Sequence, residues 1–430
     1  MLQQSDRSIA RHTGWLAATS VVELIGGLAF VFFATRILGP SGFGALAVVM
    51  ATATLVHGIV SIGGSDTVIT FATRSVAEGR PRDAAGVVRF VALMSFGMSL
   101  LAYVVVALIA ALAADLVLVD GTDTAALLWY ALVGVVIANN ATAIAVLRLA
   151  DRLKLRFAVA CASNVVRVGL LGVFWQVGGD VLAVVWASLA GAAMSGLGLL
   201  LAAASSSTQA GMGTLVGSAT LYVPQDVRRF HWATFGRTVV GAMGQNIDTL
   251  LLAQFLGAAE VGVYRVARQI VDMTRQPFRM LRAAVQPVVS RHWHGGEGRL
   301  VRAAVKRYTV LSVLVAIAGL TTLALLRDPI AALFLGAEFS DVGSLILILI
   351  PGAFFTSLGV LAMLPIVAGR AGPALLSLAS GLAVSVLAII LLVPAHGVEG
   401  GAWARVMLSL VSFLVLLPFI MATLRRSRTL

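Results

Sequence analysis

Charged residues are scarce in this sequence, and several motifs typical of enzymes are missing from it. Only 12% of the 430 residues are Asp, Glu, Lys or Arg, about half the share of a soluble domain. The single cysteine, Cys161, excludes an intrachain disulfide. The sequence contains no GxxxxGK(S/T) phosphate-binding loop, no metal-ligand cluster and no nucleophile motif. We therefore expect a protein that is not an enzyme and that needs no cofactor or metal.

Long apolar runs, in contrast, are abundant. Hydrophobic residues make up 59% of the chain, and a helix needs about 20 consecutive apolar residues to cross a bilayer. In lipid, only helices and closed barrels satisfy every backbone polar group. The runs therefore predict an all-α polytopic membrane protein with twelve transmembrane helices. They lie at residues 14–38, 42–64, 86–112, 125–147, 157–176, 181–204, 232–257, 260–285, 305–326, 343–365, 373–394 and 398–424.

The loops between these runs differ in charge. Loops after even-numbered runs are basic, as in 148–156 and 291–307, whereas loops after odd-numbered runs hold only Arg36 and Arg327 among basic residues. By the positive-inside rule, both termini are then cytoplasmic, and the protein is a multi-pass protein of the inner (plasma) membrane. The net charge of +12 lies mostly in these loops, so we expect no nucleic-acid partner.

The sequence also contains a weak internal repeat. A shift of 218 residues lays the first six runs onto the last six, and it places Gly44 on Gly262. Because each copy has an even number of spans, the copies are parallel repeats. We expect six-helix halves at 1–204 and 232–430, a cytoplasmic linker at 205–231, and a substrate site between the halves.

The eighth run carries a stripe of arginines. Steps of three and four residues place these side chains, with Asp272 in the one gap, on a single face of a helix at 260–290. One arginine facing lipid costs roughly 2.5–3.5 kcal/mol, so the stripe is expected to face protein or a water-filled cavity that attracts anions. Its members are Arg265, Arg268, Arg275, Arg279 and Arg282.

Two simpler interpretations compete with an anion site. In the first, the segment is an amphipathic helix on the membrane surface, but every later loop would then change sides, and the basic loop 291–307 would lie outside. In the second, the stripe is a buried ion-pair ladder. The acids within spans are too few for that, because they are outnumbered by arginines. The acids are Glu23, Asp66, Asp248 and Asp272, and the further arginines within spans are Arg167, Arg237 and Arg405.

Other polar residues within spans are candidates for ion coupling or for lining a cavity. Gln245, Asn246 and Asp248 interrupt the seventh run, and Glu23 lies in the first. A salt bridge from Asp248 to a stripe arginine, and a helix–helix contact by Glu23, are equally good interpretations. Asp272 can pair with either flanking arginine, and Pro277 predicts a kink within the stripe.

Several of these motifs resemble one family. The stretch Arg36-Ile-Leu-Gly-Pro-Ser-Gly-Phe-Gly44 is similar to a signature of polysaccharide biosynthesis proteins, the Wzx-type flippases of the multidrug/oligosaccharidyl-lipid/polysaccharide (MOP) superfamily. The order Asn246-Ile-Asp248, Leu256-Gly257, Val261-Gly-Val-Tyr264 and Pro287-Val-Val-Ser290 is also similar to that family.

The resemblance implies a function. Members of this family move a polyprenyl-pyrophosphate-linked oligosaccharide from the inner to the outer leaflet, as in lipopolysaccharide O-antigen synthesis. The implied partners are this lipid-linked substrate, the bilayer, and the glycan polymerase and glycosyltransferases of the pathway. The rival functions are a cation-coupled drug or metabolite antiporter of the same superfamily and a non-transporting scaffold of a polysaccharide assembly complex.

Overall fold

The computed structural model describes residues 2–60, 67–114, 118, 122–212, 235–370 and 372–427, and within these ranges every regular element is a helix. The chain divides into two compact units. The first unit consists of Met1–Leu38 and Val48–Asn246, and the second of Gly39–Ala47 and Ile247–Leu430. The predicted division at 204 and 232 remains a prediction, and residues 213–231 of the predicted linker lie outside the described residues.

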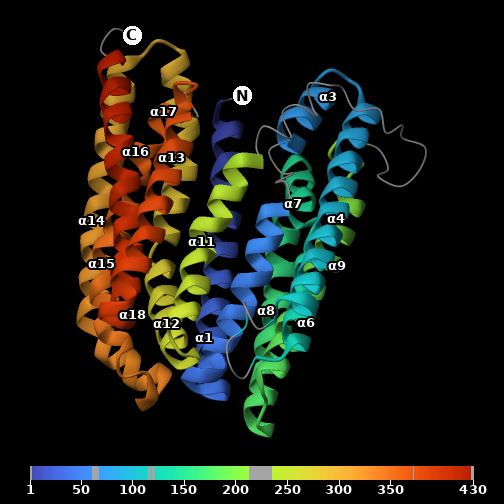
Figure 1. Cartoon of the computed structure of the whole chain (residues 1–430). Coiled ribbons are helices and arrows are strands. Elements are labelled where there is room, and N and C mark those ends of the chain that lie inside the picture. The colour runs from blue at the N-terminus through green and yellow to red at the C-terminus, as the bar shows by residue number, and fades with distance from the viewer. Residues whose placement is uncertain are drawn as a thin grey trace. The chain divides into compact units, whose positions relative to one another are not determined.

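The first unit is a bundle in which α9 packs against α8 and α6, and α4 packs against α6 (Figure 1). Local signals set the helix ends. Gly178 ends α8 in the left-handed conformation (φ 78°), and the Asp180 side chain then accepts from the backbone N–H of Ala183, which starts α9. The elements are α1 (Leu2–Val60), η1 (Val68–Ala72), α3 (Thr73–Ala77), α4 (Pro81–Leu112), α6 (Thr124–Val136), α7 (Asn140–Leu149), α8 (Leu153–Val177), α9 (Val181–Ser206) and α11 (Phe235–Phe255), of which α1 and α11 continue into the second unit.

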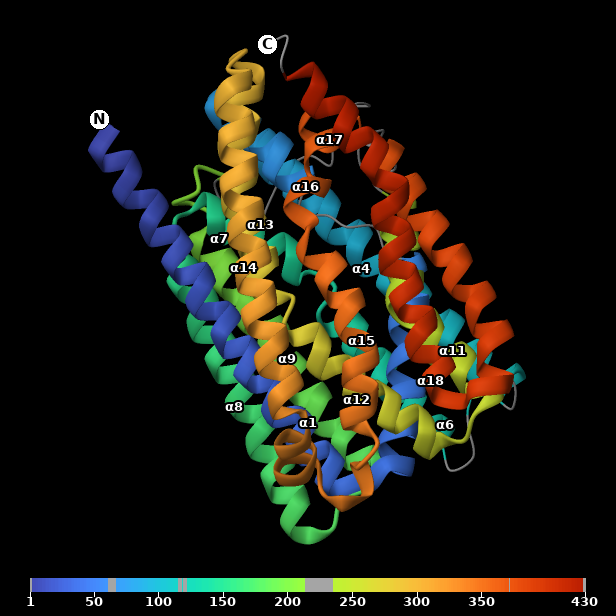
Figure 2. The same ribbon diagram turned by 90° about the vertical axis from the view of Figure 1, so that its left-hand side faces the viewer.

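In the second unit, α15 is the central helix, because it packs against α12, α14 and α18. Figure 2 shows α15 with α16 and α17 continuing beyond it. A 40° bend separates Val342–Ser357 from Gly359–Val367. The elements are α12 (Ala258–Met273), α13 (Gln276–His294), α14 (Gly298–Ile330), η2 (Ala331–Leu335), η3 (Ala337–Phe339), α15 (Val342–Ser357), α16 (Gly359–Ala362), α17 (Leu364–Val367) and α18 (Gly372–Arg426).

The apolar helices make this a multi-pass membrane protein. Among the described residues, seven helices are long and apolar enough to cross a bilayer, or eight if the bent pair that begins at Val342 counts as one span. Two of the seven contain a left-handed glycine, Gly39 (φ 62°) in α1 and Gly397 (φ 52°) in α18, which divides each into two helical segments. Both glycines fall between predicted spans. The number of twelve spans and the cytoplasmic termini remain predictions.

The repeated glycines, Gly44 and Gly262, lie against each other's helices inside the second unit. A methyl group on Gly44 would lie 1.7 Å from the carbonyl oxygen of Ala258, and one on Gly262 would lie 2.1 Å from that of Pro40. Only glycine allows such an approach of two helix backbones. The signature around residues 36–44 therefore has a structural role, because Gly39 turns the chain, Pro40 follows that turn and Gly44 permits the crossing.

Candidate functional site

The stripe helix is interrupted at its centre. The predicted single helix at 260–290 is wrong, because α12 ends at Met273 and α13 begins at Gln276, with Pro277 in its first turn. Proline lacks the N–H that an uninterrupted helix would use and clashes with the preceding turn, so the chain breaks where the sequence predicts a kink. Arg265 and Arg268 belong to α12, whereas Arg279 and Arg282 belong to α13.

Asp248 is the buried centre of the charged residues. Its side chain is on α11 in the second unit, and the residue is 1% exposed. Its Oδ1 accepts from Arg268 Nη1 at 2.5 Å and from the Thr249 backbone N–H at 2.8 Å. Its Oδ2 accepts from the Tyr264 hydroxyl at 2.8 Å and lies 3.6 Å from Arg405 Nη1. Both oxygens of this carboxylate are thus satisfied by three different helices.

A second carboxylate, Asp272, extends the network toward the helix break. It lies 3.4 Å from Arg268 Nε and 2.9 Å from Arg275 Nη1, so it pairs with both of the arginines of which the sequence allowed either. Arg275 Nη2 also donates to the Thr356 hydroxyl at 3.1 Å. Arg268 therefore bridges the two carboxylates, and Arg275 links the break to α15.

Among the described residues that make these contacts, the charges do not cancel. The network contains four guanidinium groups and two carboxylates, a net charge of two positive. Arg265 contributes through a contact of 3.5 Å from its Nη1 to the Thr249 hydroxyl. We call this set the Asp248 cluster, and its members are Asp248, Tyr264, Arg265, Arg268, Asp272, Arg275 and Arg405.

A very small cavity lies beside the Asp248 cluster. Its volume is about 10 Å³, which is room for about one water molecule. Its polar walls come from Arg268, Asp272, Arg275, Arg405 and Ser409. The Nε atom of Arg275 is buried and has no hydrogen-bond partner among the described residues. The cluster thus combines a surplus of positive charge with a donor that lacks an acceptor.

The other predicted site residues lie outside this network. Arg279 and Arg282 are exposed on α13, and Arg279 Nη2 donates to the side chain of Gln276. Gln245 is exposed, whereas Asn246 is buried and donates to the Ala242 carbonyl of its own helix.

Glu23 belongs to the first unit. It accepts from Arg156 at 3.4 Å and so links α1 to α8. This geometry favours the interpretation of Glu23 as a helix–helix contact. The function of all these residues remains a prediction.

Two members of the cluster had no assigned role in the sequence analysis. Tyr264 is fully buried, and its hydroxyl becomes a candidate only because it donates to Asp248, which lies 16 positions earlier in the chain. Arg405 is 6% exposed and lies within the last apolar run, which also holds Glu399 near its start. An ionisable residue within a membrane span is a candidate for function by default. Among the described residues, no group of three or more His, Cys, Asp or Glu side chains is arranged to hold a metal ion.

Comparison with known proteins identifies related sequences and folds. A sequence model described as polysaccharide biosynthesis protein matches residues 33–344. No curated protein matches the chain.

Solved structures with the same fold are transporters of the MOP superfamily. An inward-facing multidrug resistance MATE transporter has a TM-score of 0.77 at 14% identity, covering 94% of this chain and 95% of that one. The lipid II flippase MurJ has 0.70 at 14% identity, covering 96% and 89%. A transporter from Pyrococcus furiosus, whose description reports a binding pocket of reverse polarity, has 0.68 at 16% identity, covering 97% and 96%.

Proposed function

Since the chain belongs to the polysaccharide biosynthesis protein family and has the fold of MOP-superfamily transporters, we propose that it moves a polyprenyl-pyrophosphate-linked oligosaccharide across the inner membrane. The direction is from the inner to the outer leaflet, and the transport cycle is alternating access. The lipid II flippase with this fold supports a lipid-linked substrate. The observation that carries the proposal is the positive surplus of the Asp248 cluster.

The charge of the substrate complements that surplus. A pyrophosphate diester carries one negative charge on each phosphate, and the cluster has two more guanidinium groups than carboxylates. Guanidinium groups bind phosphate oxygens through two parallel hydrogen bonds and keep their charge when buried. A cationic drug would be repelled by the same surplus, so the cluster disfavours a multidrug antiporter.

Arg275 is the member of the cluster best placed to change partners. Its side chain is 22% exposed, against 4% for Arg268. It sits at the break between α12 and α13, and the exposed Arg279 and Arg282 follow it on α13. We assign phosphate binding to these three arginines. Arg268 and Arg405 instead pair with Asp248, and Arg268 also pairs with Asp272, which holds Arg275. The small cavity beside the cluster belongs to a closed state, and the break at Pro277 lets α13 move to open it.

Transport by the purified protein tests this assignment. Proteoliposomes containing a fluorescent polyprenyl-pyrophosphate oligosaccharide report the fraction moved between leaflets. Replacing Arg275→Gln and Arg279→Gln together is expected to slow transport at least about 100-fold, because each lost hydrogen bond to a charged group contributes about 1.5–3 kcal/mol, which is about 10- to 100-fold. Arg275→Lys with Arg279→Lys is expected to restore part of the rate, since lysine keeps the charge but loses the paired hydrogen bonds.

The matched control removes the same charge elsewhere. Arg299 and Arg307 are exposed on α14 and contribute no contact to the Asp248 cluster. Arg299→Gln with Arg307→Gln is expected to transport at the wild-type rate. Wild-type transport by the Arg275 and Arg279 pair as well would refute the anion site. If the wild-type protein moves no substrate but still binds the glycan enzymes in the liposomes, the scaffold function is favoured instead. Uptake of a cationic dye would favour the antiporter.

A further inference from the structure

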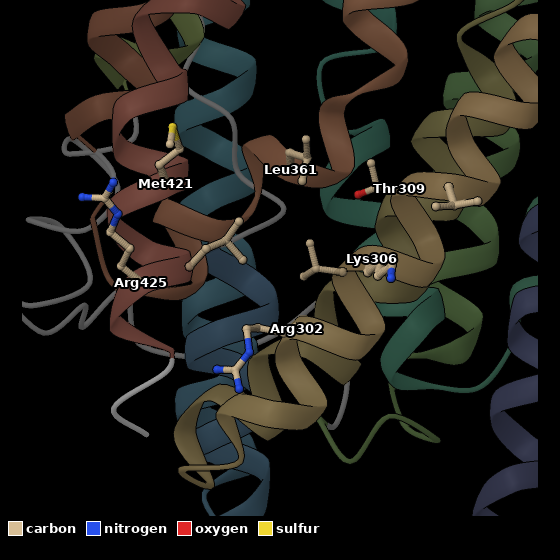
Figure 3. Close-up of a pocket in the computed structure, with 9 residues that line it drawn as sticks. Arg302, Lys306, Thr309, Leu361, Met421 and Arg425 are labelled. Carbon is tan, nitrogen blue, oxygen red and sulfur yellow. The ribbon is translucent and has the colours of Figure 1, made fainter.

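A second basic pocket lies in the second unit, away from the residues of the Asp248 cluster. It is a groove of about 620 Å³, formed by α14, α16 and α18, and it shares no lining residue with the cavity beside Asp272. Figure 3 shows Arg302, Lys306 and Thr309 on one side of the space and Met421 and Arg425 on the other, with Leu361 between them. We call it the α14–α18 groove.

The lining of the groove is amphipathic. Its charged groups are all cations, from Arg302, Lys306 and Arg425, and its lining contains no acidic residue. Among the described residues, Lys306 and Arg425 have no ion-pair partner, and both are exposed. The remaining surface is mostly apolar and comes from Val305, Val310, Leu361, Met421 and Leu424.

One polar atom in the groove also lacks a partner. The hydroxyl of Thr309 is buried and makes no hydrogen bond in the described part of the chain. A hydroxyl in a helix normally bonds the carbonyl one turn earlier when nothing else is present. Arg302, in contrast, is already engaged, because its Nη1 donates to the Ser427 carbonyl and so ties the start of α14 to the end of α18.

We propose that the α14–α18 groove binds an anionic phospholipid of the bilayer. The phosphate lies between Lys306 and Arg425, and the acyl chains lie along the apolar wall between α14 and α18. Free phosphate would leave the five apolar side chains of the lining uncovered, and a zwitterionic lipid would bring its own cation to a cationic site. Basic pockets between membrane helices on the cytoplasmic side are the common form of such sites, and the sequence predicts this side for both ends of the groove.

Native mass spectrometry of the detergent-solubilised full chain tests the proposal, because it counts the lipids that remain bound. Phosphatidylglycerol is expected to bind at one site at least tenfold more tightly than phosphatidylcholine with the same acyl chains. Lys306→Gln with Arg425→Gln is expected to weaken that binding about 10- to 30-fold, because each cation near an anionic headgroup strengthens the binding several-fold. Lys306→Arg with Arg425→Lys is expected to retain it.

The control removes two positive charges from exposed positions outside the groove. Arg299→Gln with Arg307→Gln keeps α14 and the same net charge as the test variant, and phosphatidylglycerol binding is expected to stay within twofold of the wild type.

An equal loss in this control, or equal binding of phosphatidylcholine, would overturn the site. Inorganic phosphate that displaces the lipid at millimolar concentration would show a free-anion site, and a polyprenyl phosphate that binds more tightly than phosphatidylglycerol would show a substrate site. Either result overturns the phospholipid assignment, while the transport assay stands independently of both.

Discussion

At the scale of single residues, Asp248 decides how the charged core of the second unit is held. Its two oxygens accept hydrogen bonds from Arg268, from the Tyr264 hydroxyl and from the Thr249 backbone N–H, and Arg405 Nη1 lies 3.6 Å from Oδ2. Removing one partner from a buried ion pair leaves the other charge without compensation, which costs more than the pair itself contributes. We therefore expect Asp248 to be required for the packing of the arginines around it, so that its loss lowers the stability of the fold.

Replacing Asp248→Asn tests this role. We expect the free energy of unfolding in detergent to fall by about 3–5 kcal/mol, because Arg268 and Arg405 would stay buried without their shared carboxylate. Tyr264→Phe removes one hydrogen bond to a charged acceptor and is expected to cost about 1.5–3 kcal/mol. Both values come from denaturant titration followed by circular dichroism.

Asp272→Asn is the comparison at a more exposed carboxylate. The Asp272 side chain is 32% exposed, so water screens its ion pairs and replaces part of them. The loss of stability is expected to be less than half of that for Asp248→Asn. Equal losses at the two positions would mean that Asp248 is not the centre of the network.

At the scale of helices, glycine and proline decide where elements turn, cross and break. Gly39 divides α1 into two helical segments with a left-handed backbone, and Gly397 does the same in α18. Pro277 separates α12 from α13 and divides the arginines between two helices. The spacing of three and four residues therefore holds within each of the two short helices, but it does not continue unbroken along the whole stripe.

The crossing of α1 and α12 gives a prediction at this scale. Gly262→Ala places a methyl group 2.1 Å from the Pro40 carbonyl oxygen, so the two backbones must separate. Overpacking of this kind costs about 1–3 kcal/mol or more. We expect a lower midpoint of thermal unfolding and a smaller monodisperse fraction on size exclusion.

Gly319→Ala supplies the control for that substitution. Gly319 lies within α14, and a methyl group there would meet nothing within 4 Å. Alanine is favoured over glycine in a helix by about 0.8–1 kcal/mol, so this variant is expected to be at least as stable as the wild type. If Gly262→Ala behaves like Gly319→Ala, then the close crossing is not needed for the fold.

At the scale of the whole molecule, the position of each loop relative to the membrane is the main prediction. The basic loop 291–307 is expected in the cytoplasm and the acidic loop around 327–341 outside. Arg299 and Asp341 are exposed positions in these two loops. Single cysteines at both positions, placed in a Cys161→Ala background, report the side directly.

The labelling is done on intact cells with a membrane-impermeant maleimide. Asp341→Cys is expected to react at once, whereas Arg299→Cys is expected to react only after permeabilisation. Reaction of Arg299→Cys in intact cells would contradict the predicted topology, and it would place the stripe segment on the membrane surface.

Much of the architecture could be derived from the sequence, because membrane helices need long apolar runs and these runs are local. The left-handed glycines at 39 and 397 lie between predicted spans, because the helix is interrupted at the same place where the apolar run ends. The pairing of Asp272 with Arg268 and Arg275 was also accessible, because all three lie within one or two helical turns.

The sequence alone determined the helical membrane class and the presence of more positive than negative charge in the second half. Only the tertiary structure decided which arginines share Asp248, because Arg405 is 157 positions away in the chain and reaches that carboxylate only when α18 packs beside α12. It also decided that Arg279 and Arg282 stay exposed while Arg268 is buried. Charge can be counted from composition, but its compensation depends on distance, and distance is set by how the helices pack.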